Sequence, residues 1–268
     1  MTKTATGRRV AHGVGDNDAF RLLVRVGYGA NGLLHVLIGL LALQVAFGKN
    51  ASADQAGAFG AIASTPGGVI LLWVIVVGTA ALALFQLIEL ILVRGGTRDA
   101  WAERIKFLGK AIVYAAIGIF AATVAMRGSA GAGDGTKSVS ARLLALPGGV
   151  ALLLLAGVVV AGIGIYLIVK GARQKFLADL TRPDGRLRQV TTILGTTGYV
   201  AKGLAILIIG VFVGFAALTS DPSKAEGLDG ALTSLTELPF GQVLLAAVAA
   251  GLVLFGLYCF VRARYAKL

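Results

Sequence analysis

The stretch GLLHVLIGLLALQVAF (32–47) contains 16 residues without a formal charge, and it directly follows a polar residue, Asn31. Two further uncharged runs of the same length occur along the chain: AIVYAAIGIFAATVAM (111–126) follows Lys110, and GLAILIIGVFVGFAAL (203–218) follows Lys202. Each copy continues through a polar loop to a proline, 35, 37 and 37 residues after the polar residue, and then to a second apolar run. The chain therefore contains three tandem copies of one unit, which we expect to be a helix, a loop and a second helix.

The composition is typical of an integral membrane protein. Hydrophobic residues make up 57% of the 268 residues and charged residues only 14%, whereas a soluble domain carries about 25% charged residues. A transmembrane helix needs roughly 20 mostly apolar residues, and six runs meet this length: 26–47, 69–93, 107–126, 150–169, 195–218 and 243–261. The runs lack the alternation of barrel strands, so the sequence predicts an all-α protein with six transmembrane helices.

The repeats also predict the organisation of the chain. We expect an N-terminal tail over 1–19, repeat 1 over 20–97, repeat 2 with its basic linker over 98–189, and repeat 3 over 190–268, arranged around a pseudo-threefold axis. A short amphipathic stretch precedes each proline, at 56–62, 139–144 and 228–235, and these stretches are predicted to be short helices on the outer membrane surface. Gly39, Gly118 and Gly210 lie eight residues after the three polar positions and predict a shared helix–helix contact.

The distribution of basic residues indicates an orientation. Of the 25 Lys and Arg residues, 18 lie on the side that carries both termini and five lie on the other side. Because cytoplasmic loops carry the excess of Lys and Arg, both termini are expected in the cytoplasm, and the polar N-terminal residues are expected to contain no signal peptide. These cations would also attract anionic lipid headgroups. The basic segments lack interleaved aromatic residues for base stacking, so we expect no nucleic-acid partner.

Several short motifs resemble a known family. Repeat 3 contains Gly-Leu-Asp-Gly-Ala-Leu (227–232), Leu-Pro-Phe-Gly (238–241) and Ala263-Arg264-Tyr265, and repeat 1 begins with Gly-Tyr-Gly-Ala-Asn-Gly (27–32). These motifs are similar to those of an uncharacterised bacterial membrane family, a domain of unknown function with three tandem two-helix repeats. The resemblance implies a six-helix protein of the bacterial cytoplasmic membrane, but no activity, cofactor or catalytic residue. Members often have a basic residue where Asn31 stands, so repeat 1 departs from the pattern there.

The three repeated polar residues, Asn31, Lys110 and Lys202, are the first candidate site. The 16 residues after each one span only about 24 Å in a helix, less than the roughly 30 Å hydrocarbon core. The residues are therefore expected near the cytoplasmic interface. Lysines there can extend to the headgroups without further role. Alternatively, the three side chains converge on the pseudo-axis and bind an anion, a phosphate-bearing solute or a lipid headgroup.

Two further ionisable residues lie within apolar runs. Glu89 is expected near the inner end of the second helix, either paired locally with Arg94 or paired with Lys110 or Lys202 inside the bundle. His35 lies one turn after Asn31, and the matching positions in the other repeats are Tyr114 and Ile206. A lone histidine is usually a packing residue, and a proton relay would require a partner. The sequence contains no His, Cys and Asp cluster that predicts a metal site.

These features favour a non-enzymatic membrane protein that binds or conducts a small anionic solute or lipid headgroup, without a cofactor. Asn31, Lys110 and Lys202 would form its polar ring, with Glu89 and His35 as further candidate ligand residues. Its partners would be membrane lipids with anionic headgroups. The alternative is an accessory or scaffold subunit that binds other membrane proteins, since few ionisable groups lie within the apolar runs.

Overall fold

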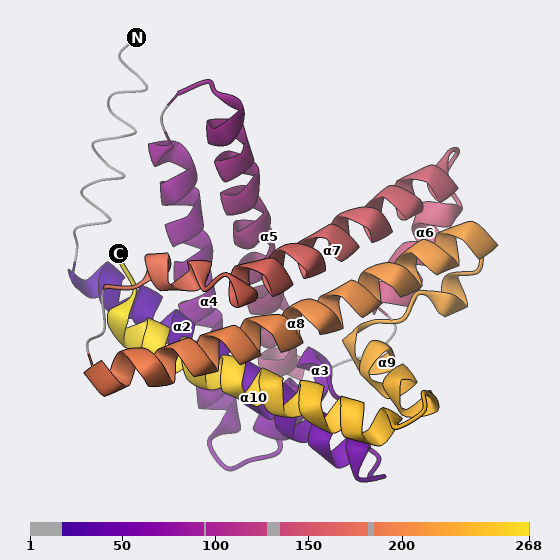
Figure 1. The fold of residues 1–268 in the computed structure, drawn as a ribbon, viewed down its shortest axis with the longest axis horizontal. Helices are drawn as coiled ribbons and strands as arrows, with labels where there is room; N and C mark the ends of the chain where they lie inside the picture. The colour runs from indigo at the N-terminus through magenta and orange to yellow at the C-terminus, as the bar shows by residue number, and fades with distance from the viewer. Residues whose placement is uncertain (1–17, 94, 128–134, 182–184, 268) are drawn as a thin grey trace. The chain divides into compact units, whose positions relative to one another are not determined.

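The computed structural model describes residues 18–93, 95–127, 135–181 and 185–267 of the chain. Six long helices dominate these ranges, and shorter helices connect them (Figure 1). The elements in chain order are α2 (Asp18–Ala46), α3 (Gln55–Ala63), α4 (Gly68–Leu92), α5 (Arg98–Arg127), α6 (Gly135–Leu144), α7 (Gly149–Ala172), η1 (Lys175–Asp179), α8 (Gly185–Thr219), η2 (Pro222–Lys224), α9 (Leu228–Thr233), η3 (Ser234–Glu237) and α10 (Gly241–Tyr265).

The six long helices confirm the predicted all-α membrane fold. Each covers one of the predicted apolar runs to within one residue and is long and apolar enough to cross a membrane. Three helices begin well before their apolar run, α2 at Asp18, α5 at Arg98 and α8 at Gly185. Hydropathy detects only the apolar part of a helix, whereas the backbone hydrogen bonding that defines a helix continues through polar residues. As a consequence, Lys202 is the central residue of α8 rather than a residue near its end.

The expected short helices are present in all three connections between the paired spans. They are α3 in repeat 1, α6 in repeat 2, and α9 followed by η3 in repeat 3. In repeat 3, Leu232 and Leu235 are buried while their polar neighbours Ser234 and Thr236 are not. The helical spacing that predicted this element therefore corresponds to a face that packs against the protein.

The turn after each short helix explains the repeated proline and glycine. A left-handed residue follows each proline: Gly67 at φ 78°, Gly148 at φ 76° and Phe240 at φ 59°. The next residue is a glycine that begins the descending helix. A Cβ at this glycine would overlap a carbonyl oxygen of the preceding short helix. The overlapping pairs are Gly68 with Ile62, Gly149 with Leu143, and Gly241 with Leu235. A proline is often the first residue of a helix, but each of these helices begins two residues after its proline, because the left-handed residue must turn the chain first.

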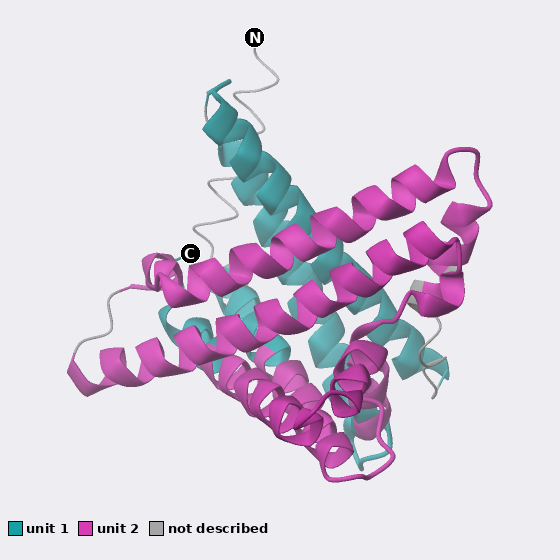
Figure 2. Cartoon of the chain, turned by 45° about the vertical axis from the view of Figure 1, so that its right-hand side comes forward, with its two compact units in different colours: residues 1–31, 62–129, 259–268 teal, residues 32–61, 130–258 magenta. Residues whose placement is uncertain are grey.

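The chain divides into two compact units (Figure 2). Unit 1 comprises residues 1–31, 62–129 and 259–268, and unit 2 comprises residues 32–61 and 130–258. Unit 1 therefore contains α4, α5, the first part of α2 and the end of α10. Unit 2 contains α7, α8, the second part of α2 and most of α10.

Small residues bring the helices of unit 1 together. The backbones of α2 and α4 meet at Gly27 and Gly78, where a Cβ on Gly78 would lie 2.8 Å from the Gly27 Cα. In α5, a Cβ on Gly118 would lie 2.8 Å from the Thr79 hydroxyl of α4. Because helices in lipid gain nothing from hiding apolar surface, such close approach is what holds them together. The unit's core consists of Val24, Tyr28, Ala81, Leu82, Ile88 and Ala266.

The helices of unit 2 use the same principle. A Cβ on Gly164 of α7 would lie 2.6 Å from the Leu207 nitrogen of α8, and one on Gly256 of α10 would lie 2.6 Å from the Gly32 carbonyl of α2. Against α8, Gly198 allows the Phe255 backbone of α10 to approach. The helix α10 consequently lies between segments of α2 and α8, so it contacts a helix of repeat 1 and a helix of its own repeat 3.

The glycine eight residues after each polar position makes an equivalent contact in every repeat. A Cβ at Gly39 would lie 2.8 Å from the Ala249 carbonyl oxygen of α10, and the same addition at Gly118 and Gly210 would meet α4 and α7. The first helix of each repeat therefore packs on the second helix of the preceding repeat, and repeat 1 packs on repeat 3. This cyclic pattern confirms the predicted shared contact.

Candidate functional site

The three repeated polar residues have different local surroundings. Asn31 is buried in unit 1, and its Nδ2 donates a hydrogen bond to the Sγ of Cys259 in α10 at 3.4 Å. Asn31 is thus engaged with the helix that packs against α2. The Cys259 Sγ, which is buried, accepts this bond.

Lys110 lies in unit 1, as does Glu89. The Lys110 ammonium lies 5.5 Å from the centroid of the Phe107 ring, one turn earlier on α5. It also interacts electrostatically with the Glu89 carboxylate at the end of α4. Two candidate residues from neighbouring repeats are therefore close enough for their opposite charges to attract.

Lys202 reaches a different helix, α10 in unit 2. Its ammonium lies 4.3 Å from the centroid of the Phe255 ring, which is well inside the roughly 6 Å range of a cation–π interaction. Phe255 is buried, and its backbone passes directly over Gly198 on α8, one turn before Lys202. The close packing at Gly198 therefore positions the ring beneath the lysine.

His35 contacts the same ring from α2. Its imidazole lies 4.8 Å from the Phe255 centroid at an interplanar angle of 61°, an edge-on arrangement. Neither the spacing of the repeats nor the position of His35 in its own helix predicts this meeting. Two side chains that can carry positive charge, from α2 and α8, thus meet at one aromatic residue of α10.

An aromatic cluster extends from this place. The Tyr199 ring lies 5.1 Å from Phe255 and 5.4 Å from Tyr258, and Phe176 stacks on Tyr199 at 5.4 Å. All four rings are buried. They form a packed aromatic cluster that carries two tyrosine hydroxyl groups. The cluster adjoins Lys202 and His35 through Phe255.

A second lysine, Lys170 of α7, lies at the other side of this cluster. It is buried, its Nζ lies 2.7 Å from the Asp179 Oδ2, and it lies 5.2 Å from the Tyr199 centroid. The apolar run predicted for this helix ends at residue 169, but α7 continues through Lys170 to Ala172. The predicted run was too short because η1 folds back and supplies a carboxylate that allows the helix to continue through a buried lysine.

The predicted site residues divide between the units. Asn31, Glu89 and Lys110 lie in unit 1, and His35 and Lys202 lie in unit 2. The polar ring around the pseudo-axis, which would need residues of both units, stays a prediction. Among the described residues, no group of three His, Cys, Asp or Glu side chains is placed to hold a metal ion.

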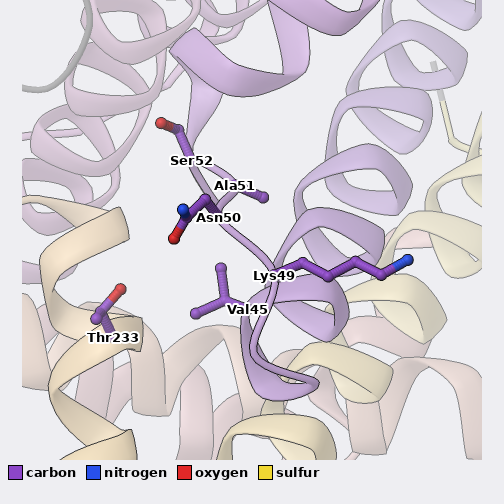
Figure 3. Close-up of a pocket in the computed structure, with 6 residues that line it drawn as sticks. All are labelled: Val45, Lys49, Asn50, Ala51, Ser52 and Thr233. Carbon is purple, nitrogen blue, oxygen red and sulfur yellow. The ribbon is translucent and has the colours of Figure 1, made fainter.

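The opposite ends of the unit 2 helices carry a separate polar region. A shallow hollow of about 430 Å³ is lined by Val45, Lys49, Asn50, Ala51, Ser52 and Thr233 (Figure 3). The Lys49 side chain points away from Thr233 in this view. None of the predicted site residues lines this hollow.

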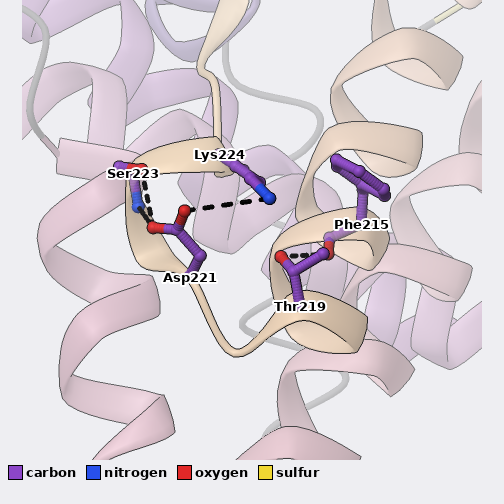
Figure 4. Close-up of polar contacts among 5 residues, drawn as sticks. All are labelled: Phe215, Thr219, Asp221, Ser223 and Lys224. Atoms are coloured by element: carbon purple, nitrogen blue, oxygen red, sulfur yellow. Dashed lines mark hydrogen bonds and ion pairs between the residues drawn. The ribbon is translucent and has the colours of Figure 1, made fainter.

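Carboxylates in the connecting segments near the hollow accept hydrogen bonds from the backbone and from a hydroxyl group. The Asp229 Oδ1 accepts a hydrogen bond from the Ala53 backbone N–H at 2.6 Å. Burial raises the pKa of Asp229; the Ala53 bond opposes this shift, and the nearby Asp54 and Glu226 add to it. At the end of α8, Asp221 accepts bonds from the Ser223 hydroxyl and backbone N–H, which lower its pKa (Figure 4).

Comparison with known proteins identifies the three repeats. The model of the family described as Domain of Unknown Function (DUF1206) matches residues 26–89, 105–174 and 197–266. The chain belongs to this family. It is also 32% identical over 252 residues to the "Uncharacterized protein YxxB" of Bacillus subtilis (strain 168), covering 90% of this chain and 89% of the relative. No solved structure matches the chain significantly.

The DUF1206 repeats, compared with one another, show a second set of matching residues that the sequence analysis missed. The residue 23 positions after each proline is charged in all three repeats, as Glu89, Lys170 and Arg262. The residue three positions before each repeated polar residue is aromatic, as Tyr28, Phe107 and Tyr199. Counting from the proline, rather than searching within apolar runs, would have found them.

These matching residues interact across the helix pairs. Lys170 of α7 lies over Tyr199 of α8, and Arg262 of α10 lies 4.6 Å from the Tyr28 centroid of α2. In the remaining pair the charge is reversed, and Glu89 of α4 interacts with Lys110, which lies over Phe107 of α5. A charged group beside an aromatic ring is thus a shared feature of the three DUF1206 repeats.

Proposed function

We propose that this protein is a non-enzymatic membrane protein that binds a small anionic group, either a free anion or the headgroup of an anionic lipid, at Lys202 and His35. The observation that carries the proposal is the meeting of these two side chains at Phe255, within 4.3 Å and 4.8 Å of its ring centroid. Both residues lie on helices that are long and apolar enough to cross a membrane, and both contact the same residue of α10.

The chemistry of the place supports an anionic ligand. A lysine ammonium presents three donors and a full charge, and a histidine can add a donor or a second charge. The surrounding rings of Phe255, Tyr199 and Tyr258 lower the local dielectric constant, which strengthens an interaction between an ammonium and an anion. The cation–π contact holds the ammonium at a defined position before a ligand arrives.

We place the protein in the bacterial cytoplasmic membrane with both termini in the cytoplasm. Support comes from the excess of basic residues on the side of the termini, 18 against five, and from the similarity to a Bacillus subtilis protein. Fusion of a reporter that is active only in the cytoplasm to the C-terminus should give an active reporter. An inactive cytoplasmic reporter with an active periplasmic or surface reporter would reverse this orientation.

The binding proposal is tested with the purified full chain in a neutral detergent. Binding of inorganic phosphate by calorimetry and of phosphatidylglycerol by native mass spectrometry separates a soluble anion from a lipid headgroup. We expect Lys202→Gln to weaken the binding of the preferred ligand about tenfold, since a hydrogen bond to a charged group contributes roughly 1.5–3 kcal/mol. A smaller loss is expected for His35→Gln.

Two lysines of unit 1 serve as comparisons. Lys106 is exposed and lies 5.6 Å from the Phe107 ring, so Lys106→Gln removes a cation–π contact and a charge away from the proposed site and should leave binding unchanged. Lys110→Gln tests the predicted polar ring of Asn31, Lys110 and Lys202. If this variant lost as much affinity as Lys202→Gln, the two lysines would act on one ligand. Unchanged binding by Lys202→Gln would contradict the proposal and favour the accessory-subunit alternative.

A further inference from the structure

The turn that precedes α10 holds an aromatic residue in an unfavourable backbone conformation. Phe240 has a φ of 59°, whereas the matching residues of the other two repeats, Gly67 and Gly148, have φ values of 78° and 76°. The left-handed conformation is costly for a residue that carries a Cβ, and glycine avoids this cost. Because backbone strain of this kind is concentrated at functional positions, the phenylalanine indicates a role for its side chain that the two glycine turns lack.

The ring of Phe240 projects from the surface together with other apolar side chains. It is 86% exposed, more than any other large apolar side chain that the structure describes, and Leu238 and Val243 beside it are 49% and 69% exposed. The chain carries no charged residue between Glu237 and Arg262, so no cation or carboxylate interrupts this surface. An apolar projection of this kind marks a contact with an apolar partner.

A second exposed phenylalanine lies at the same end of the helix pair formed by α2 and α10. These helices run in opposite directions, with Gly39 packed against Ala249. Eight residues further along α2 is Phe47, and eight residues back along α10 is Gly241, the first residue of that helix. Phe47 directly follows α2 and is 77% exposed. The rings of Phe47 and Phe240 are therefore exposed at one level on two adjoining helices of unit 2.

The length of the apolar run in α10 indicates what covers these rings. Residues 243–261 carry no charge and span about 28 Å as a helix, close to the roughly 30 Å thickness of the hydrocarbon core. Phe240 precedes this run by three residues, so it falls where the hydrocarbon meets the headgroups. Large aromatic side chains, Trp and Tyr above all, are enriched at this depth. Rings at one level on two helices also fit a layer that surrounds the protein better than a local protein partner.

We propose that Phe240 and Phe47 anchor unit 2 in the membrane by inserting their rings into the lipid at the boundary between hydrocarbon and headgroups. The occupant of this surface is the part of the acyl chains next to the glycerol. Because His35 of α2 lies 12 residues before Phe47, the anchor would hold it about 18 Å below this boundary. This role concerns the depth of the protein in the membrane, and it does not depend on ligand binding at Lys202 or on the stability of the fold.

The test places a fluorescent reporter at Phe240 itself. The two native tryptophans, Trp73 and Trp101, are replaced by phenylalanine, and Phe240→Trp supplies the single fluorophore of the full chain. The protein is reconstituted in nanodiscs of phosphatidylcholine brominated either near the glycerol or near the methyl end of the acyl chains. We expect bromines near the glycerol to remove most of the fluorescence and iodide in the water to remove little. Stronger quenching by the deep bromines would overturn the boundary assignment.

Two further single-tryptophan variants make the result independent of the strained turn. Phe47→Trp should give the same quenching pattern as Phe240→Trp, and it tests the anchor even if the latter variant fails to fold. Ser223, which is exposed in the polar η2 segment, is the control, since Ser223→Trp should be quenched by iodide and spared by the bromines. Quenching of the two anchor variants by iodide would place the rings in water, and protection from both quenchers would place them against a second protein copy; either result would overturn the proposal.

Discussion

The ammonium of Lys170 and the carboxylate of Asp179 form an ion pair of 2.7 Å that closes η1 onto the end of α7. The lysine is buried, and the Tyr199 ring lies against it at 5.2 Å. A buried ammonium is tolerated here because the pair and the ring together replace the water that it would otherwise need. The η1 segment that follows α7 is therefore a folded structural element of unit 2.

Removal of this carboxylate should destabilise unit 2. Asp179→Asn leaves the Lys170 charge buried without its counterion, and we expect a loss of about 3 kcal/mol in the free energy of unfolding. Thermal unfolding in detergent measures the effect. The pair of Lys137 and Glu226, at 3.1 Å, is the control because neither of its side chains is as buried as that of Lys170; Glu226→Gln should cost under about 1 kcal/mol. Equal shifts in the two variants would contradict the buried-pair interpretation.

The close contact of α7 with α8 gives a second prediction. A Cβ on Gly210 would overlap the Ala161 backbone nitrogen, whereas a Cβ on Gly214 of the same helix would meet nothing within 4 Å. Gly210→Ala should therefore destabilise the protein by about 1–3 kcal/mol, and Gly214→Ala should be neutral or slightly stabilising. The melting temperatures of the two variants, measured side by side, test this contrast. Equal melting temperatures would mean that α7 and α8 do not approach closely at Gly210.

Phe240 allows a stabilising substitution. It has a φ of 59° and is 86% exposed, while the matching residues in the other two repeats are glycines. A left-handed conformation costs a non-glycine residue roughly 1–2 kcal/mol, and the greater freedom of glycine in the unfolded chain offsets part of this cost. Phe240→Gly should raise the stability by about 1 kcal/mol, and a lower melting temperature would exclude this backbone conformation.

The stability of the protein should depend on pH through the titration of Asp229. Because burial, Asp54 and Glu226 raise the pKa of Asp229 despite the bond from Ala53, the folded state binds its proton more tightly than the unfolded state. Stability from this group is therefore present at low pH and is lost as the pH rises from the ordinary pKa of an aspartate through the raised value. Asp229→Asn, which keeps an oxygen for Ala53, should reduce that loss in melts between about pH 3 and 7.

Asp221 is the control with the opposite sign. The two bonds from Ser223 lower its pKa, so its stabilisation is present above the ordinary pKa of an aspartate and is lost as the pH falls through the lowered value. Asp221→Asn should therefore remove stability at neutral pH and leave the stability at low pH unchanged. If both variants changed the pH profile in the same direction, the assignment of the two shifts would be wrong.

The sequence by itself determined the membrane fold and its threefold repetition. The apolar runs after Asn31, Lys110 and Lys202 are local signals, because 20 consecutive apolar residues can satisfy their backbone in lipid in only one way. The short helix before each proline was also predictable from its local pattern. The matching glycines Gly39, Gly118 and Gly210 predicted a shared contact, since close packing requires a small residue at that point of each helix.

Only the tertiary structure decided what each polar residue contacts. The three repeated residues occupy matching positions, yet Asn31 bonds to Cys259, Lys110 interacts with Glu89, and Lys202 lies over Phe255. The contacts of His35 and Lys202 with the Phe255 ring and the burial of Lys170 beside Asp179 were equally unpredictable. Hydropathy reports whether a helix crosses the membrane, but its rotation and its neighbours depend on packing between helices that are distant in the chain, and these determine which polar groups meet.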